Sequence, residues 1–196
     1  MKTVLTDASS AILLYKSDLF DILLDSWQVV MAPAVYGEIT VPGYPGAALF
    51  KDRFDTGRFR VTPPPAHSMN LSVKASVTEN SPFARPGQPM NGTGEQETIA
   101  LFTPDLDGFI LMDDARGARE CRRQNIPYVN ALLVPKLLWY SGAITREQCT
   151  EIMAGLCALG RYSNQVRAWA LHCTQLDLGP FLNSSIKEHQ NHDTTC

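Results

Sequence analysis

The sequence predicts an α/β fold in which a mostly parallel sheet of about five strands is covered by helices on both faces. Short β-rich runs alternate with helix-length segments, and this alternation favours strand–helix–strand units. The length of 196 residues fits one domain, and a hydrophobic content of 44% is enough to bury a sizeable core.

The individual elements follow from short-range patterns. Strands are expected where short runs are rich in apolar or β-branched residues, at 2–6, 28–32, 59–62, 109–113 and 127–130. Helices are expected at 8–26, from Pro33, and at 46–56, 94–103, 115–124, 131–142, 146–158 and 164–172. The helix at 94–103 starts with a capping-box pattern, because Gln96 follows Thr93 by three residues.

Two polar stretches interrupt this pattern. Residues 63–92 are rich in proline, serine and asparagine, which predicts a mobile insertion that could cover a site. Residues 183–196 are expected to be a disordered tail, and its His189, His192 and Cys196 lack the second ligand pair of a metal clip. The predicted organisation is a domain at 1–145, a helical extension at 146–182 and this tail.

Charge and cysteine content exclude several classes of protein. With 17 basic and 20 acidic residues the net charge is −3, so contact with nucleic acid would need a local basic patch. The five cysteines form no CxxC pair and no signal-peptide segment is evident, which predicts a cytoplasmic protein with reduced thiols. Apolar stretches such as 131–140 are too short and too interrupted to cross a membrane.

Acidic residues follow two of the predicted strands. Asp7 comes directly after the first, and Asp113 and Asp114 come after the fourth. In an open parallel sheet, ligands bind beyond the carboxyl ends of the strands, where the strand order reverses. If the first and fourth strands are neighbours there, these carboxylates converge.

Two glutamates on predicted helices can join them. Glu38 lies in the second turn of the helix that begins at Pro33, and Glu95 lies in the first turn of the helix at 94–103. Glu97 is about 200° around that helix from Glu95 and is expected to point elsewhere. Clustered carboxylates need a cation, and oxygen-only ligation suits Mg²⁺ or Mn²⁺, which can activate water for attack on a phosphate.

Each acid also has a purely structural explanation when it is taken alone. Asp7 could cap a helix, and Glu95 could be a favourable charge in a first turn. The joint placement of the acids favours a site. Because successive residues leaving a strand point to opposite sides, one of Asp113 and Asp114 is expected to contact the metal, directly or through water, and the other to cap the helix at 115–124.

Three arginines lie on one face of that helix. Arg116, Arg119 and Arg123 fall within about 60° of each other around the axis. They form either a phosphate-binding stripe, which the planar guanidinium group suits, or a solvated face in which Arg116 or Arg119 braces an aspartate. Both interpretations stay open.

Four segments, VLTDASSAILL, PAVYGEI, GTGEQETIAL and FILMDDARGARECRRQNIPYV, occur in this order and together resemble the PIN domain family. The resemblance covers residues 2–145 and is greatest to prokaryotic predicted nucleic-acid-binding proteins. It implies a three-layer α/β/α PIN-like fold and a ribonuclease that hydrolyses RNA phosphodiester bonds with Mg²⁺ or Mn²⁺. Many such proteins are toxins of toxin–antitoxin pairs, so RNA and an antitoxin protein are the implied partners.

Carried over by position, the resemblance assigns roles to the residues already singled out. It makes Asp7, Glu95 and Asp113 or Asp114 the metal ligands, Glu38 a further catalytic acid, and Ser9 a hydroxyl that positions water. The insertion at 63–92 and the helices after residue 145 depart from a minimal PIN domain.

Other classes of protein remain as alternatives. A non-catalytic PIN-like module that binds RNA or protein is the principal one. A receiver domain needs an acid pair after the first strand and a haloacid-dehalogenase-type phosphatase needs Asp-x-Asp there, whereas TDASS has one acid. The apolar residues at 131–144, with Ile152, Leu156 and Leu159, either complete the core, which we prefer, or form a homodimer surface.

Overall fold

A computed structural model describes residues 1–65 and 93–182, and its described strands form one parallel five-stranded sheet. The strands are β1 (Thr3–Thr6), β2 (Gln28–Met31), β3 (Arg60–Val61), β4 (Gly108–Leu111) and β5 (Tyr128–Val129). Their order is β3-β2-β1-β4-β5, and every pairing is parallel. The chain builds outward from β1 to β3 and then returns to the other side of β1, so the strand order reverses between β1 and β4.

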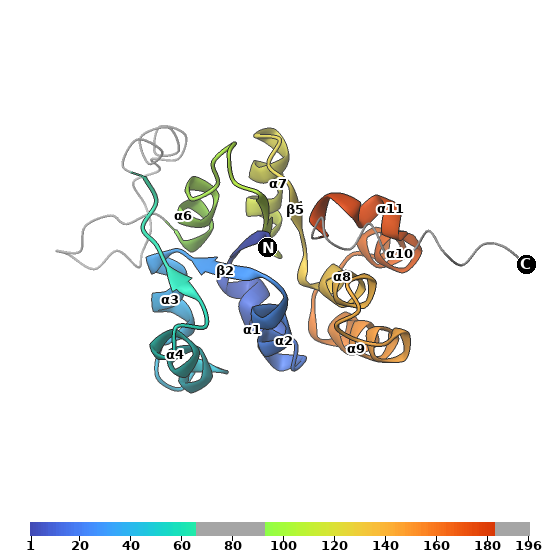
Figure 1. Cartoon of the computed structure of the whole chain (residues 1–196), viewed down its shortest axis with the longest axis horizontal. Coiled ribbons are helices and arrows are strands. Elements are labelled where there is room, and N and C mark those ends of the chain that lie inside the picture. The colour runs from blue at the N-terminus through green and yellow to red at the C-terminus, as the bar shows by residue number, and fades with distance from the viewer. Residues whose placement is uncertain (66–92, 183–196) are drawn as a thin grey trace, which may run out of the picture.

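The helices cover both faces of this sheet, which confirms the predicted three-layer α/β/α fold. On one side lie α6 (Gly94–Ala100) and α7 (Ala115–Arg123) (Figure 1). Toward the other side lie α1 (Ala8–Lys16), α2 (Phe20–Ser26), α3 (Pro33–Ile39), α4 (Ala47–Asp55), α8 (Val134–Tyr140) and α9 (Arg146–Leu159). The chain continues through α10 (Asn164–His172) and α11 (Gln175–Leu178), with 3₁₀ turns η2 (Ala131–Leu133) and η3 (Gly179–Phe181).

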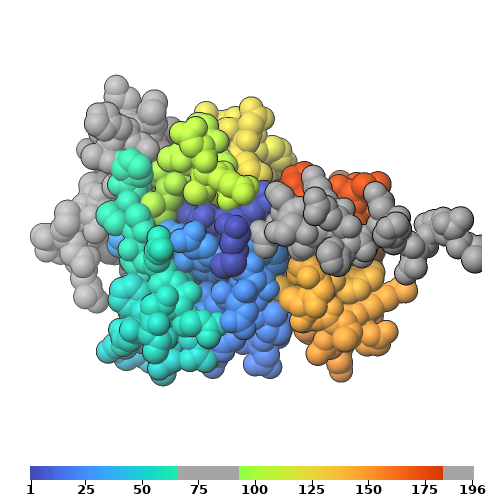
Figure 2. Space-filling view, in the orientation of Figure 1, coloured from blue at the N-terminus to red at the C-terminus, as the bar shows by residue number. Residues whose placement is uncertain are grey.

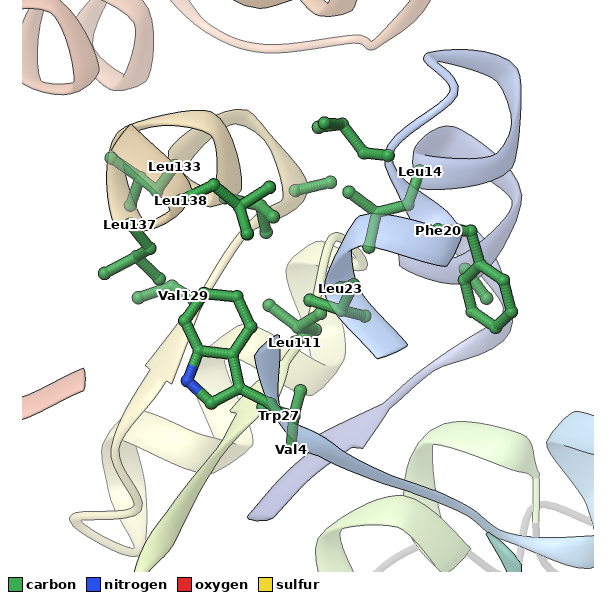
Figure 3. Close-up of a cluster of buried hydrophobic side chains, with 14 of the residues drawn as sticks. Val4, Leu14, Phe20, Leu23, Trp27, Leu111, Val129, Leu133, Leu137 and Leu138 are labelled. Carbon is green, nitrogen blue, oxygen red and sulfur yellow. The ribbon is translucent and has the colours of Figure 1, made fainter. Parts of the chain in front are cut away.

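The two central strands send side chains alternately into two separate cores. Val4 and Leu111 belong to the larger core, on the side of α1, α2 and α8, and Figure 3 shows them with Trp27 among its members. Leu5 and Ile110 belong to the smaller core under α6 and α7. Both faces are therefore buried, as expected for a parallel sheet with helices on each side.

The segments described after residue 145 share the larger core. Met153, Leu156 and Leu178 are buried in the same cluster as Val4. Figure 2 shows α8 and α9, in orange, directly against the N-terminal helices, in blue. Of the apolar residues left open between core and dimer surface, Leu156 is buried, Ile152 is half-buried and Leu159 is 49% exposed.

Several predicted boundaries shift. The helix expected at 8–26 is two helices, because Asp18 takes a positive φ of 55° and turns the chain so that Leu19 and Phe20 enter the core. The helix expected at 131–142 starts as η2, and the helical turns at 175–181 were not predicted. Residues 66–92 of the insertion expected at 63–92 and the whole tail expected at 183–196 lie outside the described residues.

Two further findings concern membranes and thiols. None of the helices in the described ranges is long and apolar enough to cross a membrane. Cys121, Cys149, Cys157 and Cys173 are free thiols.

Candidate active site

Asp7 lies at the carboxyl end of β1, at the point where the strand order reverses. Its Oδ1 accepts a hydrogen bond of 2.6 Å from Ser10 N and thereby caps α1, and its Oδ2 accepts one of 3.3 Å from Asp113 N. The residue is 2% exposed. Burial raises the pKa of Asp7 to about 7, and the nearby charge of Asp113 adds to the effect.

Asp113 follows β4, beside Asp7, because β1 pairs with β4 up to Thr6 and Leu111. Its Oδ2 accepts hydrogen bonds from Ser10 Oγ at 2.7 Å and from Ala131 N at 2.9 Å. Its Oδ1 accepts one of 2.7 Å from the hydroxyl of Tyr162. Burial raises the pKa of Asp113, although these donors oppose the rise.

Asp114 is the member of the pair that caps a helix. Its Oδ1 accepts hydrogen bonds from Arg116 N at 2.7 Å and from Gly117 N at 2.9 Å, at the start of α7. The carboxylates of Asp113 and Asp114 therefore have separate sets of partners, as expected for successive residues that leave a strand.

Glu95 and Glu38 lie on α6 and α3. Burial raises the pKa of Glu95, the charges of Asp114 and Glu38 raise it further, and Arg116 lowers it. Partial burial also raises the pKa of Glu38, and the backbone of Gly94 opposes the rise. Glu38 lies against the residue before Glu95, because a Cβ added at Gly94 would be 3.0 Å from Glu38 Oε1.

Glu97 connects the same two helices from within the protein. It is 5% exposed, and its Oε2 accepts a hydrogen bond of 2.9 Å from Ala34 N, in the first turn of α3. From its position on the helix, Glu97 is expected to point away from Glu95. The structure shows that Glu97 binds the start of α3, which carries Glu38, so it fixes the position of that helix relative to α6.

Ser10 and Tyr162 contact the acids but were not among the residues predicted from the sequence. Ser10 is buried and binds both Asp7 and Asp113, whereas Ser9 is exposed and its role with water stays a prediction. Asn130 precedes the Ala131 amide that binds Asp113, and its buried Oδ1 has no hydrogen-bond partner among the described residues. The "ASS" triplet offered two serines, and only the packing of α1 shows which one faces the sheet.

The arginines of α7 differ from one another. Arg123 forms a salt bridge with Glu120, and its hydrogen bonds lower the pKa of Glu120 to about 2. Arg116 and Arg119 are exposed, and neither takes part in a salt bridge found in residues 1–65 and 93–182. Arg116 and Arg119 are therefore the members of the stripe most available to a phosphate.

The donor chemistry of this edge fits a hard divalent cation. Asp7, Glu38, Glu95, Asp113 and Asp114 take part in no salt bridge within the described ranges, so no basic side chain neutralises them by direct contact. All their donor atoms are oxygens, as Mg²⁺ and Mn²⁺ prefer. No three acidic, histidine or cysteine residues of the described part are already arranged as metal ligands. Asp7, Asp113 and Asp114 each accept hydrogen bonds from backbone N–H groups or hydroxyls, which hold their oxygens at this edge of the sheet.

Comparison with known families identifies the class of protein. The chain belongs to the PIN domain family, because a PIN domain family model (DUF3368) matches residues 3–172. The resemblance seen over residues 2–145 is thereby confirmed, and the match extends through α9 and α10. PIN domains are generally nucleases and typically use divalent metals, and the fold here is nuclease-like. A search of curated proteins found no match.

Proposed function

We propose that this protein is a metal-dependent ribonuclease that hydrolyses RNA phosphodiester bonds. The observation that carries the proposal is the placement of Asp7, Asp113 and Asp114 at the carboxyl ends of β1 and β4, with Glu95 near Asp114 and Glu38 against the start of α6. Asp7 is buried, Asp113, Asp114 and Glu95 are half-buried, and none of the five acids takes part in a salt bridge within the described ranges. A carboxylate removed from water without a counter-charge costs free energy that a bound cation recovers.

The residues divide this work among themselves. Asp7, Glu95 and Asp113 would hold Mg²⁺ or Mn²⁺, whereas Asp114 caps α7 beside them. The bound cation supplies a Lewis acid that lowers the pKa of a water molecule and stabilises charge on the scissile phosphate. Glu38 lies beside Glu95 and can accept a proton at its carboxylate. Arg116 and Arg119 bind the phosphate backbone at the start of α7.

The proposed biological setting is a toxin held in check by an antitoxin protein. Its support is the family resemblance alone. In this setting, induced expression of the chain arrests bacterial growth through RNA cleavage, and expression of the Asp7→Asn variant does not.

Cleavage of end-labelled single strands tests the proposed activity. The wild-type protein is expected to cut RNA in Mn²⁺ or Mg²⁺, to leave DNA of the same sequence intact, and to lose activity in EDTA. Asp7→Asn should reduce the rate by at least about 100-fold, because it removes a metal ligand at the centre of the site. Asp105→Asn is the matched control, since Asp105 is exposed in the turn before β4.

Three outcomes would overturn the proposal. RNA that binds without being cut would identify a non-catalytic PIN-like module. Equal cleavage of DNA would make the protein a general nuclease. Cleavage that survives in Asp7→Asn would place the reaction at another surface.

A further inference from the structure

Tyr162 connects the C-terminal helices to the acidic edge of the sheet, which comprises Asp7, Asp113 and Asp114 after β1 and β4 together with Glu95 and Glu38. It lies between α9 and α10, and its hydroxyl donates a hydrogen bond of 2.7 Å to Oδ1 of Asp113. None of the motifs that identify the acids includes this residue. The contact joins the segment between α9 and α10 to the residues that follow β4.

Asp113 is held by donors on both of its oxygens. Ser10 Oγ and Ala131 N bind Oδ2, and Tyr162 is the donor found on Oδ1 within the described part of the chain. Without the Tyr162 hydroxyl, Oδ1 would lose that donor and the carboxylate would be free to rotate about a fixed Oδ2. The Tyr162 hydroxyl therefore fixes the second oxygen of Asp113, which Ser10 and Ala131 leave unbound.

Two sets of hydrogen bonds link Asp113 to Asp7. The backbone N–H of Asp113 donates to Asp7 Oδ2 at 3.3 Å. Ser10 also bridges the two acids, because its amide binds Asp7 Oδ1 at 2.6 Å and its hydroxyl binds Asp113 Oδ2 at 2.7 Å. If the Asp113 carboxylate turns away, Ser10 loses a partner for its hydroxyl, and Ser10 is the residue whose amide binds Asp7.

The ring of Tyr162 is closely packed by its neighbours. It packs against the larger core and over Gly160, where an added Cβ would lie 2.2 Å from Tyr162 Cε2. The preceding helix α9 is anchored by the buried Met153 and Leu156. The hydroxyl is therefore delivered to Asp113 from a rigid support, as a group that orients a ligand shell requires.

We infer that Tyr162 is a positioning residue whose hydroxyl, through Asp113 and Ser10, orients Asp7 and so sets the affinity of the acidic edge for a divalent cation. The inference deepens the proposed function and rests on it. Hydrogen bonds to the groups around a metal raise affinity because they restrict the ligands to their binding orientation. The inference also gives the helices after residue 145 a role in the site.

Calorimetric titration with Mn²⁺, in the absence of RNA, tests the inference. Tyr162→Phe removes the hydroxyl and keeps the ring, and it is expected to weaken Mn²⁺ binding about 10-fold or more. Tyr128→Phe is the matched control, because it removes a hydroxyl that accepts a hydrogen bond of 3.0 Å from Arg122. RNA affinity in EDTA should be the same in both variants, since neither change alters the charge of the protein.

The outcomes separate this inference from the proposed function. If the wild-type protein binds no Mn²⁺, both are overturned. If the wild type and Tyr162→Phe bind Mn²⁺ equally, only the role of Tyr162 is overturned. Equal weakening in Tyr162→Phe and Tyr128→Phe would also overturn it, because the loss would then follow from removing any such hydroxyl. A loss confined to Tyr162→Phe supports it.

Discussion

At the scale of single residues, the candidate site is a set of carboxylates, some of which cap a helix and are also proposed to bind a metal ion. Asp7 caps α1 and is 2% exposed, so its charge is poorly solvated. Asp114 caps α7 and remains close enough to raise the pKa of Glu95. Helix capping holds these side chains in place before any cation arrives, and burial makes their charge costly until one does.

The raised pKa of Asp7 predicts a specific pH dependence of stability in EDTA. Because the folded-state pKa of about 7 lies above the ordinary value of 3.8, folding favours the protonated form. This contribution is fully present below about pH 4 and is lost as the pH rises to about 7, with an upper limit of about 4 kcal/mol. Asp7→Asn has no charge to bury, so its stability should not show this loss.

Melting temperatures between pH 5 and pH 8 measure this effect. Asp7→Asn is expected to gain on the wild type as the pH rises, whereas the difference between Asp105→Asn and the wild type should stay constant. A difference between Asp7→Asn and the wild type that does not vary with pH would show that Asp7 titrates normally.

At the scale of elements, α7 connects the acidic edge to both the smaller core and the solvent. Gly117 and Cys121 are buried on its inner side, and Arg116 and Arg119 are exposed on its outer side. Asp114 caps the same helix. The packing of α7 on the sheet therefore fixes the positions of Asp114 and of the two arginines together.

Substitutions at two helix glycines test how closely α7 packs on the sheet. A Cβ at Gly117 would lie 2.3 Å from Sδ of Met112, which is 1% exposed, whereas a Cβ at Gly155 in α9 would meet no atom within 4 Å. Gly117→Ala is expected to destabilise by about 1–3 kcal/mol through overpacking. Gly155→Ala is expected to stabilise by up to about 1 kcal/mol, because alanine favours the helix. Denaturant unfolding measures both changes, and a stabilised Gly117→Ala would mean that α7 can lift from the sheet.

The arginines of α7 predict a difference in the salt dependence of RNA binding. Each phosphate contact made by Arg116 or Arg119 releases condensed counterions and contributes about −0.7 to the slope of log affinity against log salt for single strands. Arg119→Gln should flatten the slope by that amount. Arg123→Gln should change it less, because Glu120 already binds the Arg123 guanidinium.

The measurement uses the Asp7→Asn protein in Ca²⁺, so that RNA is bound without being cut. Arg123→Gln serves as the control for the loss of one positive charge from the same helix. If neither change alters the slope, RNA enters by another surface.

At the scale of the whole molecule, strand order and the C-terminal helices bring the acids together. The reversal between β1 and β4 places Asp7 beside Asp113, although 105 residues separate them in the chain. Lys136 of α8 is 7% exposed and donates hydrogen bonds to Leu171 O at 2.8 Å and Cys173 O at 2.7 Å, which joins α8 to α10. This junction helps to hold the segment that carries Tyr162 against the core.

The sequence by itself determined the fold class, the five strands and the order of the acidic motifs. These features depend on local periodicity, on helix capping such as the Thr93–Gln96 pair, and on an ordered set of motifs, all of which can be recognised along the chain. It also predicted that Asp113 and Asp114 would differ, because side chains alternate along an extended strand.

Only the tertiary structure decided which groups meet around the acids. The choice of Ser10 over Ser9 depends on how α1 packs on the sheet, and the break at Asp18 depends on the burial of Leu19. The contact between Tyr162 and Asp113 joins residues 49 positions apart that no local pattern relates. Such pairings are set by the packing of whole elements on a common core, whereas local propensity acts over a few residues.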